Sequence, residues 1–248
     1  MKTEGISLGW NCSAAQDGLK LGLRDTKQNG YKTCPFDMMV TNYIGVCKCI
    51  EDDFKFFCDP NYLELRPAPI MSPHIPNQID NEMWVFNSYY NFFFNHESPY
   101  HGKLYLNEQW SSPNHFVENN FQRFIERYER RINNFRTYMA ESELINFILW
   151  RYNSSPTELL EIIKRKYPNL KFKINTIVDF GRHTVDCLIT KTADSSKEYE
   201  MDYLKYMNIT EDEYPEEFAR YRNELITEDS VKDEHIVLIY PNKTSTLN

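Results

Sequence analysis

The sequence predicts one α/β domain over residues 1–248, with a mixed, mostly parallel sheet flanked by helices. Its second half alternates apolar, strand-like runs with an amphipathic helix, the pattern of a right-handed βαβ unit. Neither an internal repeat nor a low-complexity linker interrupts the 248 residues. A chain of this length is long enough to bury a substantial core as one domain.

The first elements predict a strand followed by a helix that begins near a cysteine. Residues 5–10 read as a short strand ending in a turn, and residues 14–23 repeat apolar side chains every four positions. Asn11 and Ser13 are both candidate N-caps, so Cys12 is expected within or beside the first helical turn. The fold class therefore includes a reactive cysteine at the start of the first helix.

The middle of the chain mixes helical and β-prone segments. Residues 41–57 look helical, and residues 65–81 are rich in proline and predict irregular structure. Residues 82–94 are aromatic and β-prone, and end in a polar turn. Residues 116–139 form the strongest predicted helix, because their apolar residues share one stripe while most arginines lie elsewhere.

The second half contains the alternation on which the fold class depends. It comprises a buried-type strand at 144–150, a helix at 156–167, a strand at 170–178, and further strands at 184–190 and 235–240. Residues 192–234 carry 14 acidic and 5 basic residues, and we interpret them as an acidic, helical insertion with a solvated surface.

The charge distribution argues against nucleic acid as a partner. The whole chain has a net charge of −8, and the acidic insertion accounts for that excess. No concentrated basic face is present, whereas a nucleic-acid-binding protein carries one. The longest apolar runs are also too short to span a bilayer, so we expect no membrane partner.

Cysteine usage predicts a cytoplasmic protein with reduced thiols. The N-terminus lacks the apolar run of a signal peptide, and the chain is large for a disulfide scaffold. Cys47, Cys49 and Cys58 are close in sequence, but they lack the paired C-x-x-C halves of a structural zinc site. We therefore expect no metal and no cofactor.

Cys12 is the most promising reactive group. Free backbone N–H groups and the positive end of the helix dipole favour a thiolate at a helix start, and the same N–H groups can stabilise an oxyanion. A small cysteine buried beneath the sheet is the competing interpretation. A base is also needed, and His96, which follows an aromatic strand, is the best placed histidine, with His101 its nearest competitor.

A third group commonly orients the imidazole in such sites. Asp37, Asn95, Glu97 and Asn107 all supply a suitable oxygen, and sequence distance does not rank them. Asp37 could equally cap a helix that begins near residue 38.

The motifs around these residues resemble a known family. Residues 6–12 (ISLGWNC), 22–24 (GLR) and 35–37 (PFD) are similar to the DUF1796 family of papain-like cysteine peptidases, as are 94–96 (FNH) and the later segments 127–132 (RYERRI), 134–135 and 144–151. The resemblance covers residues 5 to 180. It implies Cys12 as nucleophile, His96 as base, and Asp37 as an orienting or structural residue. A papain-like fold would be α+β, which is the alternative fold class.

Three functional hypotheses follow. The leading one is a cysteine-dependent hydrolase or acyl transferase, of the peptidase or amidase type, acting on a peptide, amide or glycan-linked substrate. The second is a glycosyltransferase-like enzyme using a nucleotide-sugar donor, since Trp- and Tyr-rich loops suit stacking on flat ligands. The third is a non-catalytic binding module with a buried Cys12. The sequence leaves the oligomeric state open.

Overall fold

The computed structural model describes residues 2–9, 11–68, 82–150, 156–177 and 233–239. The helices in this part are α1 (Cys12–Lys20), α2 (Tyr43–Glu51), α3 (Leu104–Asn107), α4 (Glu118–Glu141) and α5 (Thr157–Lys166). The strands are β1 (Thr3–Ser7), β2 (Leu63–Pro67), β3 (Met83–Asn87), β4 (Phe92–Phe94), β5 (Leu144–Trp150), β6 (Phe172–Ile177) and β7 (Ile236–Ile239). Short 3₁₀ helices include η2 (Pro35–Met38) and η4 (Asn95–Glu97).

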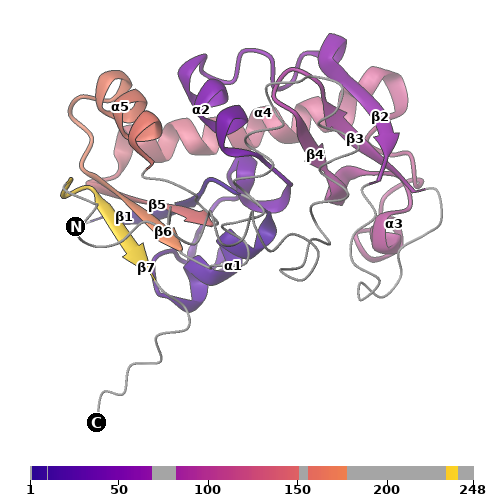
Figure 1. Cartoon of the computed structure of the whole chain (residues 1–248). Coiled ribbons are helices and arrows are strands. Elements are labelled where there is room, and N and C mark those ends of the chain that lie inside the picture. The colour runs from indigo at the N-terminus through magenta and orange to yellow at the C-terminus, as the bar shows by residue number, and fades with distance from the viewer. Residues whose placement is uncertain (1, 10, 69–81, 151–155, 178–232, 240–248) are drawn as a thin grey trace, which may run out of the picture.

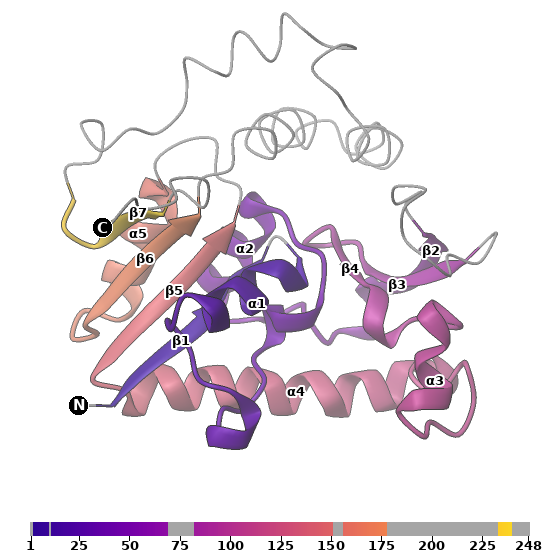
Figure 2. The same ribbon diagram turned by 90° about the horizontal axis from the view of Figure 1, so that it is seen from below.

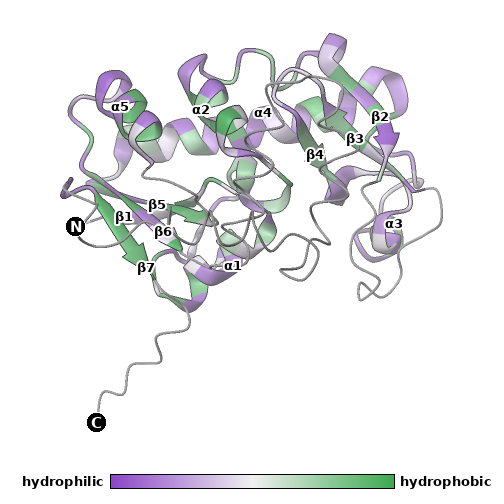
Figure 3. Cartoon of the chain, in the orientation of Figure 1, coloured by the Kyte–Doolittle hydropathy of each residue, from purple (hydrophilic) through white to green (hydrophobic). Residues whose placement is uncertain are grey.

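A four-stranded parallel sheet with the order β1-β5-β6-β7 forms one half of the molecule (Figure 1). Each neighbouring pair is parallel, and α5 connects β5 to β6. The predicted mostly parallel sheet flanked by helices is therefore confirmed, and so is the βαβ unit. Strands β5 and β7 of this sheet are among the most hydrophobic segments of the chain (Figure 3).

Helices cover both faces of this sheet. Ile145, Phe147 and Leu149 alternate along β5 and belong to the main core, which also contains the buried side chains of α2, α4 and α5. The intervening Ile148 packs with Ala14 of α1 on the opposite face. Figure 1 accordingly shows α2, α4 and α5 on one side of the sheet and α1 on the other.

A second sheet, antiparallel and with the order β2-β3-β4, was not part of the predicted fold. The aromatic segment 82–94 is a hairpin rather than one strand, because it reverses between β3 and β4 and Asn91 adopts a positive φ of 56° there. Residues 65–67, expected to be irregular, pair in β2 instead. The architecture is therefore mixed, with a parallel and an antiparallel sheet.

Two predicted helices end earlier than their apolar pattern suggested. Helix α1 stops at Lys20, ahead of Gly22, whose φ is +67°. Helix α2 stops at Glu51, because the chain takes positive φ values at Asp53 and Phe54. The predicted strand at 184–190 and almost all of the acidic insertion 192–234 lie outside the described residues. The prediction of a single domain stays a prediction.

Helix α4 joins the two halves. It runs behind both sheets in Figure 1 and along the whole width of the molecule in Figure 2. Helix α1 lies between the two sheets in both views, so its N-terminus is close to the junction. Among the described helices, none combines the length and the apolar character needed to cross a membrane.

Candidate functional site

Cys12 is the first residue of α1 and is partly exposed. The side chain of Asn11 caps this helix, since its Oδ1 accepts a 2.8 Å hydrogen bond from the backbone N–H of Ser13. The predicted helix start is therefore confirmed, and Asn11 rather than Ser13 is the cap.

The turn before Cys12 is held against the segment that leads to His96. Gly9 has a φ of +99°, and a Cβ there would lie 1.8 Å from Oγ1 of Thr41, so this turn requires glycine. Thr41 donates a 3.4 Å hydrogen bond to the carbonyl of Leu8. The adjacent Val40 exchanges backbone hydrogen bonds of 2.8 and 3.0 Å with Phe93 in β4. Residues 40 and 41 thus tie the start of α1 to the strand that precedes His96.

The thiol of Cys12 does not have the lowered pKa that its helix position predicts. Burial raises the pKa of Cys12, although its own backbone N–H acts in the opposite direction. Two other amides of the first turn are already engaged, because Ser13 and Ala14 both donate to Asn11. The first turn therefore does not offer several free amides to an oxyanion.

His96 lies in η4, directly after β4, and its side chain is partly buried. Its ring makes no hydrogen bond to any described residue, and its centroid is 5.7 Å from that of His101. Burial lowers the pKa of His96 to about 4 from its ordinary value of 6.5, and the charges of Arg127 and Arg131 lower it further against the opposing effect of Glu97. The imidazole is consequently neutral at pH 7.

His101, the competing histidine, has a carboxylate partner. Its Nδ1 lies 3.1 Å from Oε1 of Glu82, whose side chain is only 3% exposed. The Trp84 ring packs edge-on against the imidazole at 5.3 Å. Sequence reasoning did not identify Glu82, because it lies 19 positions before His101 in the chain, on the other side of the β3–β4 hairpin.

Asp37 is buried in η2 and holds local structure. Its carboxylate accepts from Arg24 at 2.9 Å, from the Tyr31 hydroxyl at 3.0 Å, and from the Cys34 backbone N–H at 2.8 Å. Burial raises the pKa of Asp37, and the Arg24 charge opposes that rise. No contact between this carboxylate and a histidine is found among the described residues. Rather than capping a helix that begins near residue 38, Asp37 accepts from Cys34, the N-cap residue directly before η2.

Glu97, the residue after His96, is enclosed by one face of α4. Its side chain is 0% exposed, with Oε1 2.9 Å from Nε of Arg127 and 3.1 Å from a terminal nitrogen of Arg131. The Tyr128 hydroxyl donates to Oε2 at 2.9 Å. Arg127 is one of the arginines expected outside the apolar stripe of this helix, and its side chain stays 26% exposed while it pairs with Glu97.

The sequence motifs converge through these contacts. Arg131 pairs with Glu97, the residue after the 94–96 motif, and its charge also lowers the pKa of Asp37 in the 35–37 motif. Arg24, from the 22–24 motif, pairs with the same Asp37. We refer to this set as the buried ion cluster: Arg24, Asp37, Glu97, Arg127, Tyr128 and Arg131. A signal for it was present, namely arginines spaced four apart within the strongest apolar helix.

The remaining candidates have no comparable setting. Asn95 Oδ1 is buried without a hydrogen-bond partner in the described chain, and Asn107 is exposed at the end of α3. Cys47 and Cys49 are buried in α2, and Cys58 is partly exposed. Across residues 2–9, 11–68, 82–150, 156–177 and 233–239, no three His, Cys, Asp or Glu residues form a group that could hold a metal ion.

Comparison with known proteins gives one match. A family model described as "Putative papain-like cysteine peptidase (DUF1796)" matches residues 3–188, which include every motif segment in the buried ion cluster and both Cys12 and His96. No significant match was found among curated proteins or among solved structures.

Proposed function

This chain belongs to the DUF1796 family, and from that premise we propose that it is a cysteine-dependent hydrolase or acyl transferase of the peptidase or amidase type. In this proposal Cys12 is the nucleophile and His96 is the general base. The substrate is a peptide or another amide, whose carbonyl carbon forms a bond with the Cys12 sulfur.

The convergence of the motifs carries the proposal. Segments 22–24 and 35–37 meet in the Arg24–Asp37 pair. Segment 127–132 pairs through Arg127 and Arg131 with Glu97, the residue directly after His96 of segment 94–96. A buried cluster of this kind is costly to desolvate and positions its neighbours rigidly. Helix α1 packs against η2, so the same cluster also supports the element that begins with Cys12.

The pKa shifts disfavour a preformed thiolate–imidazolium pair and make proton transfer from Cys12 to His96 uphill in the free protein. Burial raises the pKa of Cys12 and lowers that of His96, so the free protein holds a neutral thiol and a neutral imidazole rather than an ion pair. The thiol proton therefore passes to His96 while the sulfur–carbon bond forms. The imidazolium then returns that proton to the leaving amine as the acyl-enzyme is made, and water releases the acyl group in a second, base-assisted step.

Asp37 and Glu97 act as positioning residues in this account. Asp37 fixes the η2 turn and Arg24 through three hydrogen-bond donors, which leaves it no role in orienting an imidazole. Glu97 anchors η4 to α4 through Arg127, Tyr128 and Arg131. Glu97 therefore contributes by fixing the position of η4, and with it the position of the adjacent His96.

A panel of fluorogenic peptide amides tests the proposal, with Cys12→Ala as the key variant. We expect Cys12→Ala to abolish release of the fluorophore and of any acyl-enzyme seen by mass spectrometry. Cys58→Ala is the matched control, because Cys58 is also a partly exposed cysteine with a pKa raised by burial, to about 12. Turnover that survives in Cys12→Ala, or that is lost equally in Cys58→Ala, would exclude Cys12 as the nucleophile.

A further inference from the structure

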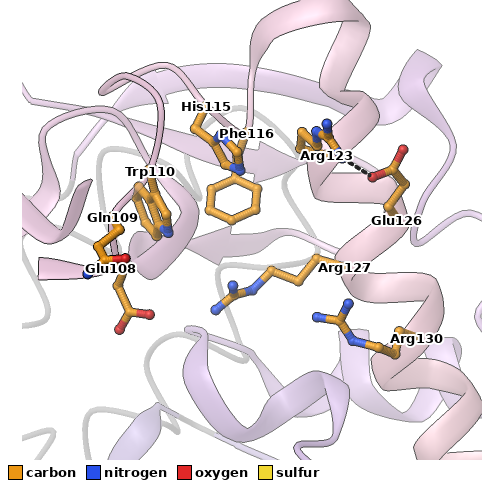
Figure 4. Close-up of a pocket in the computed structure, with 9 residues that line it drawn as sticks. All are labelled: Glu108, Gln109, Trp110, His115, Phe116, Arg123, Glu126, Arg127 and Arg130. Carbon is orange, nitrogen blue, oxygen red and sulfur yellow. Dashed lines mark hydrogen bonds and ion pairs between the residues drawn. The ribbon is translucent and has the colours of Figure 1, made fainter. Parts of the chain in front are cut away.

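A pocket of about 370 Å³ opens between the first half of α4 and the loop after α3 (Figure 4). Two kinds of side chain line it on opposing sides. Arg127 and Arg130 reach into it from α4, and Trp110, His115 and Phe116 form the wall across from them. This site is separate from Cys12, and nothing in the proposed hydrolase chemistry uses it.

The cationic side of the pocket has spare binding capacity. Arg123 on the rim is neutralised by Glu126 at 3.0 Å, and Arg127 approaches Glu97 through its Nε. The terminal nitrogens of Arg127 and the whole guanidinium of Arg130 have no hydrogen-bond or ion-pair partner among the described residues. Both groups extend in the same direction in Figure 4. Two guanidiniums that line one pocket match the oxygens of a phosphate group.

The opposite side is a flat aromatic surface. The Trp110 ring stands edge-to-face with Phe116 at 4.7 Å, and it lies nearly parallel to His115, with an interplanar angle of 14°. Trp110 and His115 are partly exposed, and both line the pocket. Arg127 lies 5.1 Å from the Phe116 ring, which brings the aromatic and cationic parts together in one pocket. An accessible aromatic surface of this kind favours a planar ring.

Glu108 completes the set of recognition groups. Its carboxylate lies on the Trp110 side of the pocket, away from Arg130, in Figure 4. At that position it can accept hydrogen bonds from hydroxyl groups but would repel a phosphate. From one side to the other, the pocket therefore presents a stacking surface, a hydroxyl acceptor and a pair of phosphate-binding cations.

We propose that this pocket binds a nucleoside phosphate, with the base on Trp110, the sugar hydroxyls at Glu108 and the phosphate on Arg127 and Arg130. The site is independent of the proposed hydrolase activity. Arg127 is the one residue common to both, since it also pairs with Glu97 in the buried ion cluster. For that reason the tests use Arg130 and Trp110 instead.

Isothermal titration calorimetry with adenosine monophosphate tests the proposal on the full chain, without any requirement for catalysis. Adenosine and ribose 5-phosphate serve as matched half-ligands, and inorganic phosphate reports on simple anion binding. We expect adenosine monophosphate to bind at least about tenfold more tightly than either half-ligand, because ring and phosphate are held by different groups. Each half-ligand should still compete with it.

Three variants locate the binding. Arg130→Gln should weaken the binding of adenosine monophosphate by about tenfold or more, since it removes a charge-assisted contact to the phosphate. Trp110→Leu should weaken it by about three- to tenfold through loss of stacking. Arg136→Gln, on the same helix but lining a different pocket, should leave the affinity unchanged. No binding at millimolar concentration, equal affinity for inorganic phosphate, or binding insensitive to both pocket variants would each overturn the proposal.

Discussion

Helix α4 places arginine–glutamate pairs in two contrasting environments. Arg131 and Glu97 are 3.1 Å apart with side-chain exposures of 6% and 0%, whereas Arg123 and Glu126 are 3.0 Å apart with exposures of 62% and 47%. The separations are almost equal, but only the first pair has lost its water. Removing one partner there leaves a charge that is buried and uncompensated, while an exposed partner is simply rehydrated.

The contrast bears on function. The buried pair lies beside His96 and connects the sequence motifs, so its cost of desolvation is consistent with a positioning role. The exposed pair lies on the rim of the arginine-rich pocket and leaves its neighbours available to ligands. One helix thus supports a rigid site on its inner face and an accessible one on its outer face.

The largest expected effect is that of Glu97→Gln. This change keeps the shape of the side chain but leaves Arg127 and Arg131 without their shared counter-charge, so we expect a loss of about 3–5 kcal/mol in the free energy of unfolding. Urea denaturation followed by circular dichroism measures it. A loss below about 1 kcal/mol would mean that the cluster is hydrated and does not differ from a surface pair.

Titration of His96 should give the next largest effect. Its pKa is about 4 in the folded chain, against 6.5 ordinarily, so the folded state resists a proton that the unfolded state accepts. The free energy of unfolding is therefore unaffected by titration of His96 above pH 6.5. It falls by about 3 kcal/mol in total as the pH drops from 6.5 to 4.

His96→Gln isolates this contribution. Urea denaturation at intervals from pH 7.5 to pH 4 should show the free energy of unfolding of the wild type falling by about 3 kcal/mol relative to that of the variant, because only the wild type has the His96 imidazole to protonate. Parallel curves over that range would show that His96 has an ordinary pKa and is exposed to water.

The smallest effect is expected at the exposed pair. Arg123→Gln removes the partner of Glu126, and we expect the free energy of unfolding to change by less than about 0.5 kcal/mol, with any change reduced further in 0.5 M salt. The same denaturation assay measures it. A cost approaching that of Glu97→Gln would remove the distinction between the two faces of α4.

The fold was predictable where local pattern and tertiary structure agree. The β5–α5–β6 unit follows directly from continuous apolar runs around an amphipathic helix. The β3–β4 hairpin was missed, because aromatic residues on both sides of the turn conceal the reversal at Asn91. Strand β2 was missed because it directly precedes a proline-rich segment and shares one of its prolines, Pro67.

The place of Cys12 at the start of α1 was predictable from the sequence, but the electrostatics around it were not. Local rules located Cys12 correctly at the start of α1, yet the direction of its pKa shift was wrong, because burial depends on the whole fold and outweighs the backbone effect. The roles of Glu82 and Glu97 were likewise hidden, since each depends on a partner distant in sequence. Pairwise contacts across a fold leave little trace in a single sequence.

Acetylation of Cys12 by 4-nitrophenyl acetate at pH 7 tests the central claim most directly, with the modified residue identified by mass spectrometry. We predict that Cys12 reacts faster than Cys58, that His96→Gln slows it by about 100-fold through loss of the general base, and that His101→Gln slows it far less. Equal rates at Cys12 and Cys58, or a Cys12 rate unchanged by His96→Gln, would contradict a reacting Cys12–His96 pair.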